Sequence, residues 1–389
     1  MPETGPQSKQ STVVPDPRRV EELRPWLCLA EMNWLGATVR AGMINEFETA
    51  EGAFRASPDR LAQVSGMDQR RLDRFLKERR QATPICDPVS LLASKTRVIT
   101  PRDDEYPELL LQTPDFPVVL FAQGPSRVDR RPHLAIVGAR QATQQGFDIA
   151  RQFGRELAAA GFVIVSGLAL GIDTFAHLGA LEAHGSTISV LGCGPDIAYP
   201  STNRRIRDQI AEKGKLVSEY PPGTVARPWH FPQRNRIIAG MCIGTLVVEA
   251  SAQSGSLITA RLAADYDRDV FAIPGNIRSQ LAQGTLALLQ DGAHLVTEPQ
   301  ALVEHYAHLL PPPEEDSERL GSPEPTLSPE EQLLVERLRD DPVPVDVLLT
   351  DGRWDRSKLF SLLLSLEMRD ILVKFPGNLY QAKTKARVR

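Results

Sequence analysis

His133-Leu-Ala-Ile-Val-Gly-Ala-Arg140 sets the architecture predicted for this chain. Its apolar run, residues 134–137, predicts a short strand that stops at Gly138, and a helix is expected over residues 143–160. In a unit of strand, glycine turn and helix, the backbone N–H groups at the helix start face the turn and can bind an anion. Arg140 lies in this turn, so the sequence predicts an anion-facing loop at the end of the strand.

The same unit recurs along the middle of the chain. Further strands are predicted at residues 162–167, 186–194 and 244–249, and each ends in, or is followed by, small polar residues or glycines. Runs of β-branched residues that alternate with helical patterns predict a parallel sheet with helices on both faces. We therefore predict an α/β fold whose core is an extended Rossmann-like parallel sheet.

Size and composition limit the classes of protein that need consideration. With 389 residues, 42% hydrophobic and 24% charged, the chain matches a globular protein of two or three domains. It has no apolar run of membrane-spanning length and no signal-peptide pattern, so we expect a cytoplasmic protein without a membrane partner. The four cysteines are widely separated and predict neither a zinc site nor a disulfide framework. At a net charge of −4, any anion site must come from locally gathered arginines and glycines.

Periodicity and composition divide the chain into six segments. A polar tail, predicted to be disordered, covers residues 1–18, and a helical module of SAM or helix-hairpin-helix type covers 19–82. The extended Rossmann-like domain spans 83–308, and a linker rich in proline and acidic residues spans 309–327. Helices followed by a hairpin predict a winged-helix domain at 328–382, which leaves a basic tail at 383–389.

The two end modules each allow two interpretations. Residues 57–68 resemble two short helices joined by a glycine hairpin, whose amides can hold a DNA phosphate, but a module that only packs on its neighbour is at least as well supported. The predicted winged helix has a capping box at Ser328 and Glu331 and mixed charges on its surface. Mixed charges favour a structural or protein-contact role over binding in a DNA groove.

Four loops of the central region form the candidate site, because parallel sheets place their ligands at the carboxyl ends of the strands. Glycines allow close backbone approach, hydroxyls and amides donate to phosphate oxygens, and guanidinium groups bind phosphate in a bidentate manner. Each loop taken singly has a structural explanation, such as relief of turn strain, a helix cap at Ser256 or an internal pair between Arg236 and Glu249. The four together favour a phosphate-binding surface. The candidate residues are Gly138, Arg140, Ser166, Gly167, Gly171, Arg234, Asn235, Arg236, Ser254, Gly255, Ser256 and Thr259.

Other chemistry finds little support in the sequence. Neither G-x-G-x-x-G nor G-x-x-x-x-G-K-[ST] occurs, so a dinucleotide or ATP clamp is not predicted. Asp173 and His177 fall one helical turn apart without a nucleophile or a metal-ligand cluster, and a capping or core role is favoured for them. Trp229 and Phe231 offer a stacking surface for a base, although packing in the core is the commoner role of such residues. We predict no catalytic residue, metal or cofactor.

Taken together, the motifs resemble the DNA-processing protein A (DprA/Smf) family in its three-domain form. The segments that carry the resemblance include Val137-Gly-Ala-Arg140, Ser166-Gly-Leu-Ala-Leu-Gly-Ile-Asp173, Tyr199-Pro-Ser-Thr-Asn203, Phe231-Pro-Gln-Arg-Asn-Arg-Ile-Ile-Ala-Gly240 and Ser254-Gly-Ser-Leu-Ile-Thr-Ala260. The resemblance implies a non-enzymatic homodimer that binds and protects incoming single-stranded DNA during natural transformation. It further implies help in loading the recombinase RecA, with single-strand-binding protein as an additional partner.

The chain departs from the family pattern at three places. Leu170 stands where an arginine is common, residues 200–203 lack a lysine often found after that proline, and Gly284-Thr-Leu replaces the usual Gly-Thr-Asn. We therefore expect a less basic pocket that depends more on backbone amides and on the remaining arginines.

Three hypotheses follow, of which the single-strand-binding mediator is favoured. The second is a nucleotide-cleaving enzyme of the Rossmann-like phosphoribohydrolase type, suggested faintly by Gly244-Thr-Leu-Val-Val-Glu249, although the paired glycines of that class are missing. The third is an adaptor that acts through its end domains. For the favoured hypothesis, Arg140→Ala and Arg236→Ala are each expected to weaken single-strand binding with little effect on folding.

Overall fold

The computed structural model describes residues 16–125, 130–310, 327–339, 342–350, 353–368, 371–375 and 379–382. Most of both predicted tails and of the linker, and the turn of the predicted C-terminal hairpin, lie outside these residues. The chain divides at residue 312 into two compact units, which are treated separately below. The finer domain bounds given above stay predictions.

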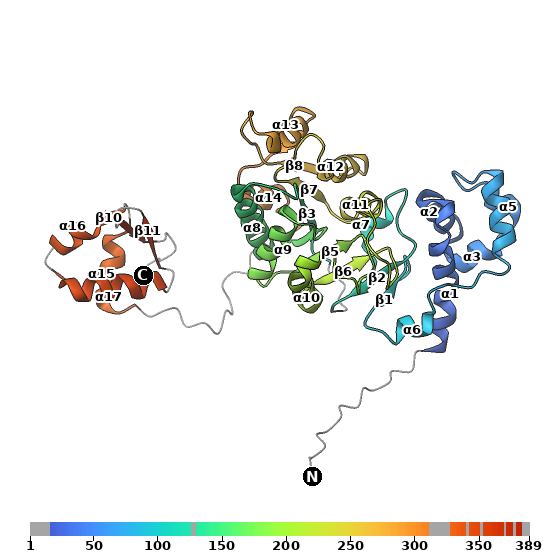
Figure 1. Ribbon diagram of the computed structural model, residues 1–389, viewed down its shortest axis with the longest axis horizontal. Coiled ribbons are helices and arrows are strands. Elements are labelled where there is room, and N and C mark those ends of the chain that lie inside the picture. The colour runs from blue at the N-terminus through green and yellow to red at the C-terminus, as the bar shows by residue number, and fades with distance from the viewer. Residues whose placement is uncertain are drawn as a thin grey trace, which may run out of the picture. The chain divides into compact units, whose positions relative to one another are not determined.

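A nine-stranded sheet forms the centre of the first unit among the described residues (Figure 1). Its order is β1 (Arg97–Ile99), β2 (Leu120–Gln123), β6 (Lys215–Ser218), β5 (Thr187–Leu191), β4 (Val163–Ser166), β3 (His133–Val137), β7 (Gly244–Val247), β8 (Asp269–Ala272) and β9 (His294–Leu295). The strands from β6 to β9 are parallel, whereas β2 runs antiparallel to β6 and β1 antiparallel to β2. The chain moves outward from β3 to β6 and then returns to β7 beside β3. This reversal is the topological switch point at which open α/β sheets bind ligands.

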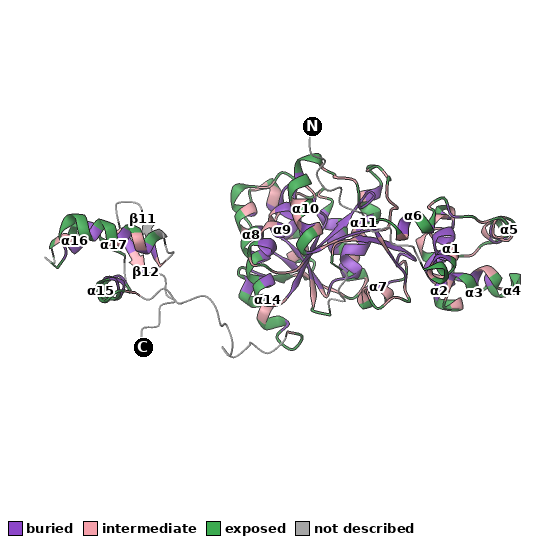
Figure 2. Cartoon of the chain, turned by 90° about the horizontal axis from the view of Figure 1, so that it is seen from below, coloured by how far each residue is buried: buried purple, intermediate pink, exposed green. Residues whose placement is uncertain are grey.

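Alternating side chains along each central strand explain why both faces are covered. On β3, Leu134 and Ile136 belong to one hydrophobic cluster, whereas Ala135 and Val137 belong to another. The first face packs against α8 (Gln144–Ala159), α9 (Ile172–Glu182) and α14 (Pro299–His305), with α10 (Arg204–Lys213) beside α9. The second face packs against α11 (His230–Gly240) and α12 (Ser256–Asp265). Figure 2 shows the buried strands between these helix layers, which confirms the predicted α/β architecture.

Shorter elements complete this unit. They are α7 (Glu108–Leu111), α13 (Gln283–Gln290) and three single-turn 3₁₀ helices at Asn33–Leu35, Ser201–Asn203 and Gln280–Ala282. None of the described helices is long and apolar enough to cross a bilayer.

The predicted helical module consists of α1 (Pro17–Glu31), α2 (Ala37–Phe47), α3 (Ala50–Arg55), α4 (Pro58–Ala62), α5 (Gln69–Glu78) and α6 (Pro88–Leu92). Several of these helices begin at a residue whose side chain accepts a backbone N–H, such as Thr49 and Ser57. Trp26, Leu35 and Phe75 are almost fully buried, and their hydrophobic cluster continues into the sheet. This shared cluster joins the module to the sheet, and α6 contacts the edge strand β1.

The turn between α4 and α5 satisfies its own polar groups. Gly66 adopts a φ of 78°, which favours glycine, and its carbonyl accepts a hydrogen bond from Arg71 at 2.6 Å. The carboxylate of Asp68 accepts the N–H of Arg71 at 2.7 Å and so occupies the start of α5. Of the two interpretations of this segment, the geometry favours internal packing over a phosphate site.

The second unit has the predicted winged-helix elements. They are α15 (Pro329–Arg337), α16 (Val345–Thr350), α17 (Arg356–Met368), β10 (Val343–Pro344), β11 (Leu372–Phe375) and β12 (Leu379–Ala382), with the strand order β10-β12-β11. The capping box is present: the Ser328 hydroxyl accepts the N–H of Glu331, and the Glu331 carboxylate accepts the N–H of Ser328. Leu359, Leu363 and Leu366 form the buried face of α17.

The close approach of α8 and α9 depends on glycine. A Cβ atom on Gly179 would lie 2.0 Å from the carbonyl oxygen of Arg151, and one on Gly154 would lie 2.3 Å from that of Ala176. Because backbone carbonyls cannot rotate away, an added methyl group must push the helices apart. We predict that Gly179→Ala lowers the free energy of unfolding by about 1–3 kcal/mol, measured by chemical denaturation. Gln145→Ala, at an exposed position of α8, is the control and should leave the stability near that of the wild type.

Candidate nucleic-acid interface

A groove of about 710 Å³ lies at the carboxyl ends of β3 and β7, on the switch point. We call it the carboxyl-edge groove. Eight of the predicted site residues line it: Gly138, Arg140, Arg234, Asn235, Ser254, Gly255, Ser256 and Thr259. Gly167 lines a small adjoining pocket of about 60 Å³. The structure therefore brings three of the four predicted loops together in one groove and places the other beside it.

Arg140 provides an exposed positive charge in the groove, unpaired among the described residues. Its side chain is exposed, and its guanidinium carbon lies 5.5 Å from the centre of the Phe231 ring. Within the described part of the chain, Arg140 has no carboxylate partner. An arginine held over an aromatic ring and free of a counter-ion can bind a phosphate while the ring stacks a base.

Two helix starts at this edge already hold carboxylates of the chain itself. At α8, the carboxylate of Glu249 accepts the N–H of Thr143 at 2.8 Å and its hydroxyl at 2.6 Å. At α9, the carboxylate of Asp173 accepts the N–H groups of Gly167 at 3.1 Å and Ala169 at 3.4 Å. These anions compensate the positive ends of the two helix dipoles. An incoming phosphate therefore finds both positions occupied.

The start of α12 lacks such an anion. Its N-cap is the exposed Gly255, which offers no side chain, and its first turn contains no acidic residue. The Asn235 side-chain amide donates to the Gly255 carbonyl at 3.3 Å, which holds the two loops together. Ser254 and Ser256 share a hydroxyl contact of 2.8 Å. Of these three helix starts, that of the ten-residue α12 is the one that holds no carboxylate among the described residues. Its dipole and its serine hydroxyls therefore remain available to an anion in the groove.

Arg234 lies in the floor of the groove. It is 4% exposed and donates to the carbonyl of Val190 at 2.7 Å. A Cβ atom on Gly167 would lie 1.7 Å from the Arg234 guanidinium, so glycine is needed for this close contact. Burial raises the pKa of the neighbouring Asp173 and lowers that of Arg234. Arg234 therefore positions the loops and contributes little accessible surface.

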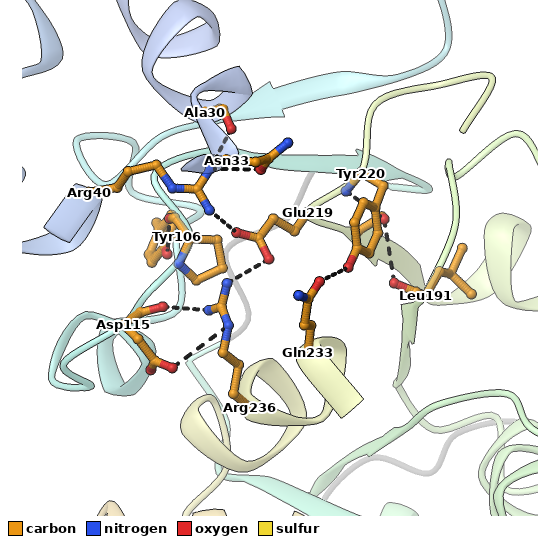
Figure 3. Close-up of polar contacts among 12 residues, drawn as sticks. Ala30, Asn33, Arg40, Tyr106, Asp115, Leu191, Glu219, Tyr220, Gln233 and Arg236 are labelled. Atoms are coloured by element: carbon orange, nitrogen blue, oxygen red, sulfur yellow. Dashed lines mark hydrogen bonds and ion pairs between the residues drawn. The ribbon is translucent and has the colours of Figure 1, made fainter. Parts of the chain in front are cut away.

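Arg236, predicted to bind DNA, does not reach the groove. Its guanidinium contacts Glu219 at 2.6 Å and the carbonyl of Asp115 at 2.5 Å, and Glu219 also contacts Arg40 at 3.4 Å (Figure 3). Two residues along a helix differ by about 200°, so Arg234 and Arg236 point to opposite sides of α11. The expectation that Arg236 lies at the site is therefore wrong, and its partner is Glu219, not Glu249.

Two other predicted residues, and two histidines, are structural. Ser166 is fully buried and donates to the carbonyl of Ile136 at 2.6 Å, and Gly171 packs where a Cβ atom would lie 2.3 Å from the carbonyl of Ala139. His177 contacts the Thr187 hydroxyl at 2.7 Å, and burial lowers its pKa to about 3. His230 contacts the Gly192 carbonyl at 3.0 Å. His177 thus has the core role that was one of the two favoured for it, and His230 is likewise packed in the interior.

Tyr199 was not predicted as a site residue, yet it lines the groove. It is 44% exposed, and its ring centre lies 5.4 Å from that of Phe231. Leu170 and Ile258, also partly exposed, continue this apolar wall. The sequence feature that could have indicated Tyr199 is an aromatic residue in the polar loop after a glycine-ended strand.

Comparison with known proteins identifies the family of this chain. A family model described as DNA recombination-mediator protein A matches residues 97–307, and one described as DprA winged helix domain matches residues 318–378. The chain belongs to the DprA/Smf family of DNA-processing proteins. Protein Smf of Escherichia coli (strain K12) is 36% identical over 334 residues, which cover 85% of this chain and 88% of that protein. DNA processing protein DprA of Streptococcus pneumoniae is 46% identical over 204 residues, 52% of this chain and 72% of that protein.

Solved structures of the family agree with the fold. The X-ray structure of DprA from Streptococcus pneumoniae matches with a TM-score of 0.60 at 38% identity, over 71% of this chain and 97% of that one. DprA from Helicobacter pylori, solved in work on its unique single-stranded DNA binding mode, matches with a TM-score of 0.51 at 29% identity. That match covers 55% of this chain and 96% of the other.

The buried charge cluster predicts that substitution of Arg236 lowers the free energy of unfolding. Glu219 is largely buried between Arg40 and Arg236. Removal of one guanidinium leaves Glu219 without full compensation, which costs about 3–5 kcal/mol for a buried pair. We predict a loss of this size for Arg236→Ala in chemical denaturation. Arg155→Ala, an exposed substitution on α8, is the control, and an equally small effect of both would contradict this assignment.

Proposed function

We propose that the carboxyl-edge groove binds single-stranded DNA without regard to sequence. The observation that carries the proposal is Arg140, free of a counter-ion, over Phe231 beside the open start of α12. Phosphates fit the guanidinium and the helix start, and Phe231 and Tyr199 offer ring faces to flexible bases. A duplex keeps its bases stacked, so the same rings would gain nothing from it. The binding mode named for the Helicobacter pylori relative supports this choice of ligand.

We infer that binding proceeds without enzymatic turnover. The carboxylate of Glu249, the candidate catalytic group of the nucleotide-cleaving hypothesis, is engaged by two hydrogen bonds from Thr143. A general base needs a free acceptor within reach of the proton that it removes. Glu249 does not line the groove. Among the described residues, the one carboxylate in the wall of the groove is that of Asp173, which is buried and accepts two backbone N–H groups.

The proposed cellular role follows from family membership. We propose that the protein acts in the cytoplasm as a homodimer, protects incoming single strands during natural transformation, and helps to load RecA onto them. Single-strand-binding protein is the competitor that such a mediator must displace. The winged helix then serves a structural or protein-contact role.

Substitution of Arg140 tests the binding proposal. We predict that Arg140→Ala weakens binding to oligothymidine about tenfold, as expected for a lost hydrogen bond to a charged group, and that it also reduces the slope of log affinity against log salt by about 0.7. Fluorescence anisotropy over a salt series measures both quantities. Arg155→Ala is the matched control, and a duplex of the same length should bind more weakly than the single strand. Unchanged affinity for Arg140→Ala would refute the assignment.

The mediator role needs a separate test. We predict that the wild-type protein shortens the lag of RecA-catalysed ATP hydrolysis on single strands coated with single-strand-binding protein, because it exposes strand to the recombinase. Arg140→Ala should lengthen that lag toward the value without added protein. A protein that binds single strands but leaves the lag unchanged would be a binder and not a mediator.

A further inference from the structure

We propose that Arg227 and Trp229 form a second nucleotide-binding station, where a strand leaving the carboxyl-edge groove crosses the start of α11. From there the strand enters a cleft of about 490 Å³ between α11, the end of β6 and the N-terminal helices. We call it the module cleft. The inference rests on the proposed function, because it extends the path of the same strand, and it assigns DNA contact to the N-terminal helical module.

The start of α11 separates the two cavities. Pro228 and Phe231 line the carboxyl-edge groove, whereas Trp229, His230 and Gln233 line the module cleft. Neighbouring residues thus contribute to cavities on opposite sides of one helix turn. A strand needs to pass only this turn to move from one cavity into the other.

Arg227 and Trp229 repeat the arrangement of Arg140 and Phe231. The guanidinium carbon of Arg227 lies 5.3 Å from the Trp229 ring centre, and Arg227 has no carboxylate partner in the described parts of the chain. Trp229 is 55% exposed, although indoles are usually buried in folded proteins. Its ring stands edge-on to His230 at 5.9 Å. An exposed ring with an unpaired arginine suits one base and its phosphate.

The acidic groups of the module cleft are engaged within the protein, which weakens their repulsion of a phosphate. Glu219 lies between Arg40 and Arg236 (Figure 3). The carboxylate of Glu31 accepts the N–H groups of Ile85 at 2.7 Å and Cys86 at 2.9 Å. Among the described residues, these are the two carboxylates that line the cleft.

The cleft also offers a hydrogen-bond donor suited to the edge of a base. Tyr220 donates its hydroxyl to the Gln233 side-chain oxygen at 2.9 Å, as Figure 3 shows. The amide nitrogen of Gln233 is then left as a donor without a partner among the described residues. A nucleotide stacked on Trp229 could accept a hydrogen bond from this donor whatever its base, because every base carries an acceptor.

The test uses the full-length chain and oligothymidines of about 5 and about 15 nucleotides, within the range of known single-strand site sizes. Trp229→Ala and Arg227→Ala should bind the long strand about tenfold more weakly, the loss expected for one stacked base, and the short strand like the wild type. Trp229→Phe should keep most of the affinity but lose the quenching of tryptophan fluorescence that the long strand causes in the wild type. Arg60→Ala, an exposed arginine over Phe47, is the matched control.

Two results would overturn the inference. If both alanine variants bind the long strand like the wild type while Arg140→Ala weakens both strands, the strand does not cross Trp229, and the proposed function still stands. If the alanine variants weaken both strands equally, Trp229 belongs to the first groove and is no second station. Failure of the proposed function has a different signature, which is unchanged binding of the short strand by Arg140→Ala.

Discussion

Glu249 holds together the two loops on which the site depends. Its backbone carbonyl accepts the N–H of Ala139 at 2.7 Å, and its carboxylate accepts two hydrogen bonds from Thr143. Glu249, two residues beyond the end of β7, thereby fixes both the turn after β3 and the start of α8. In many Rossmann-like proteins a ligand anion sits at that helix start. Here an internal anion takes its place, so the groove opens toward α12 instead.

If the groove binds DNA as proposed, it shows how a protein with a net charge of −4 can present a surface for a polyanion. Most arginines around it are engaged: Arg234 lies in the floor and Arg236 is paired with Glu219. Among the described residues around it, Arg140 and Arg227 have unpaired guanidinium groups over aromatic rings. Since surface potentials decay within about 10 Å at physiological salt, a few unpaired cations beside ring faces suffice locally. Leu170, which stands where an arginine is common in the family, adds no positive charge to this surface.

Local patterns predicted much of the fold. The continuous apolar run over residues 134–137, set among helical patterns, predicted that β3 lies in a sheet covered on both faces. Thr143 and Ser328 were expected at helix starts from their types and positions. The family resemblance, which rested on longer motifs, is confirmed. Long-range pairs could not be foreseen in this way. Glu249 meets a residue 106 positions away and Glu219 one 179 positions away, and no local pattern encodes such contacts. Arg236 was misplaced because its segment was taken as a polar loop, whereas α11 already begins at His230.

The paired charges under α11 have a consequence for communication within the first unit. Through Arg236 and Glu219 this helix is joined to Arg40 on α2, while its opposite side carries Arg234 and Asn235. A rigid helix engaged on both sides cannot shift at one without disturbing the other. If a partner that moved α2 also moved this helix, the affinity of the carboxyl-edge groove for its ligand would change. By thermodynamic reciprocity, occupancy of the groove would then change the affinity for that partner by the same factor.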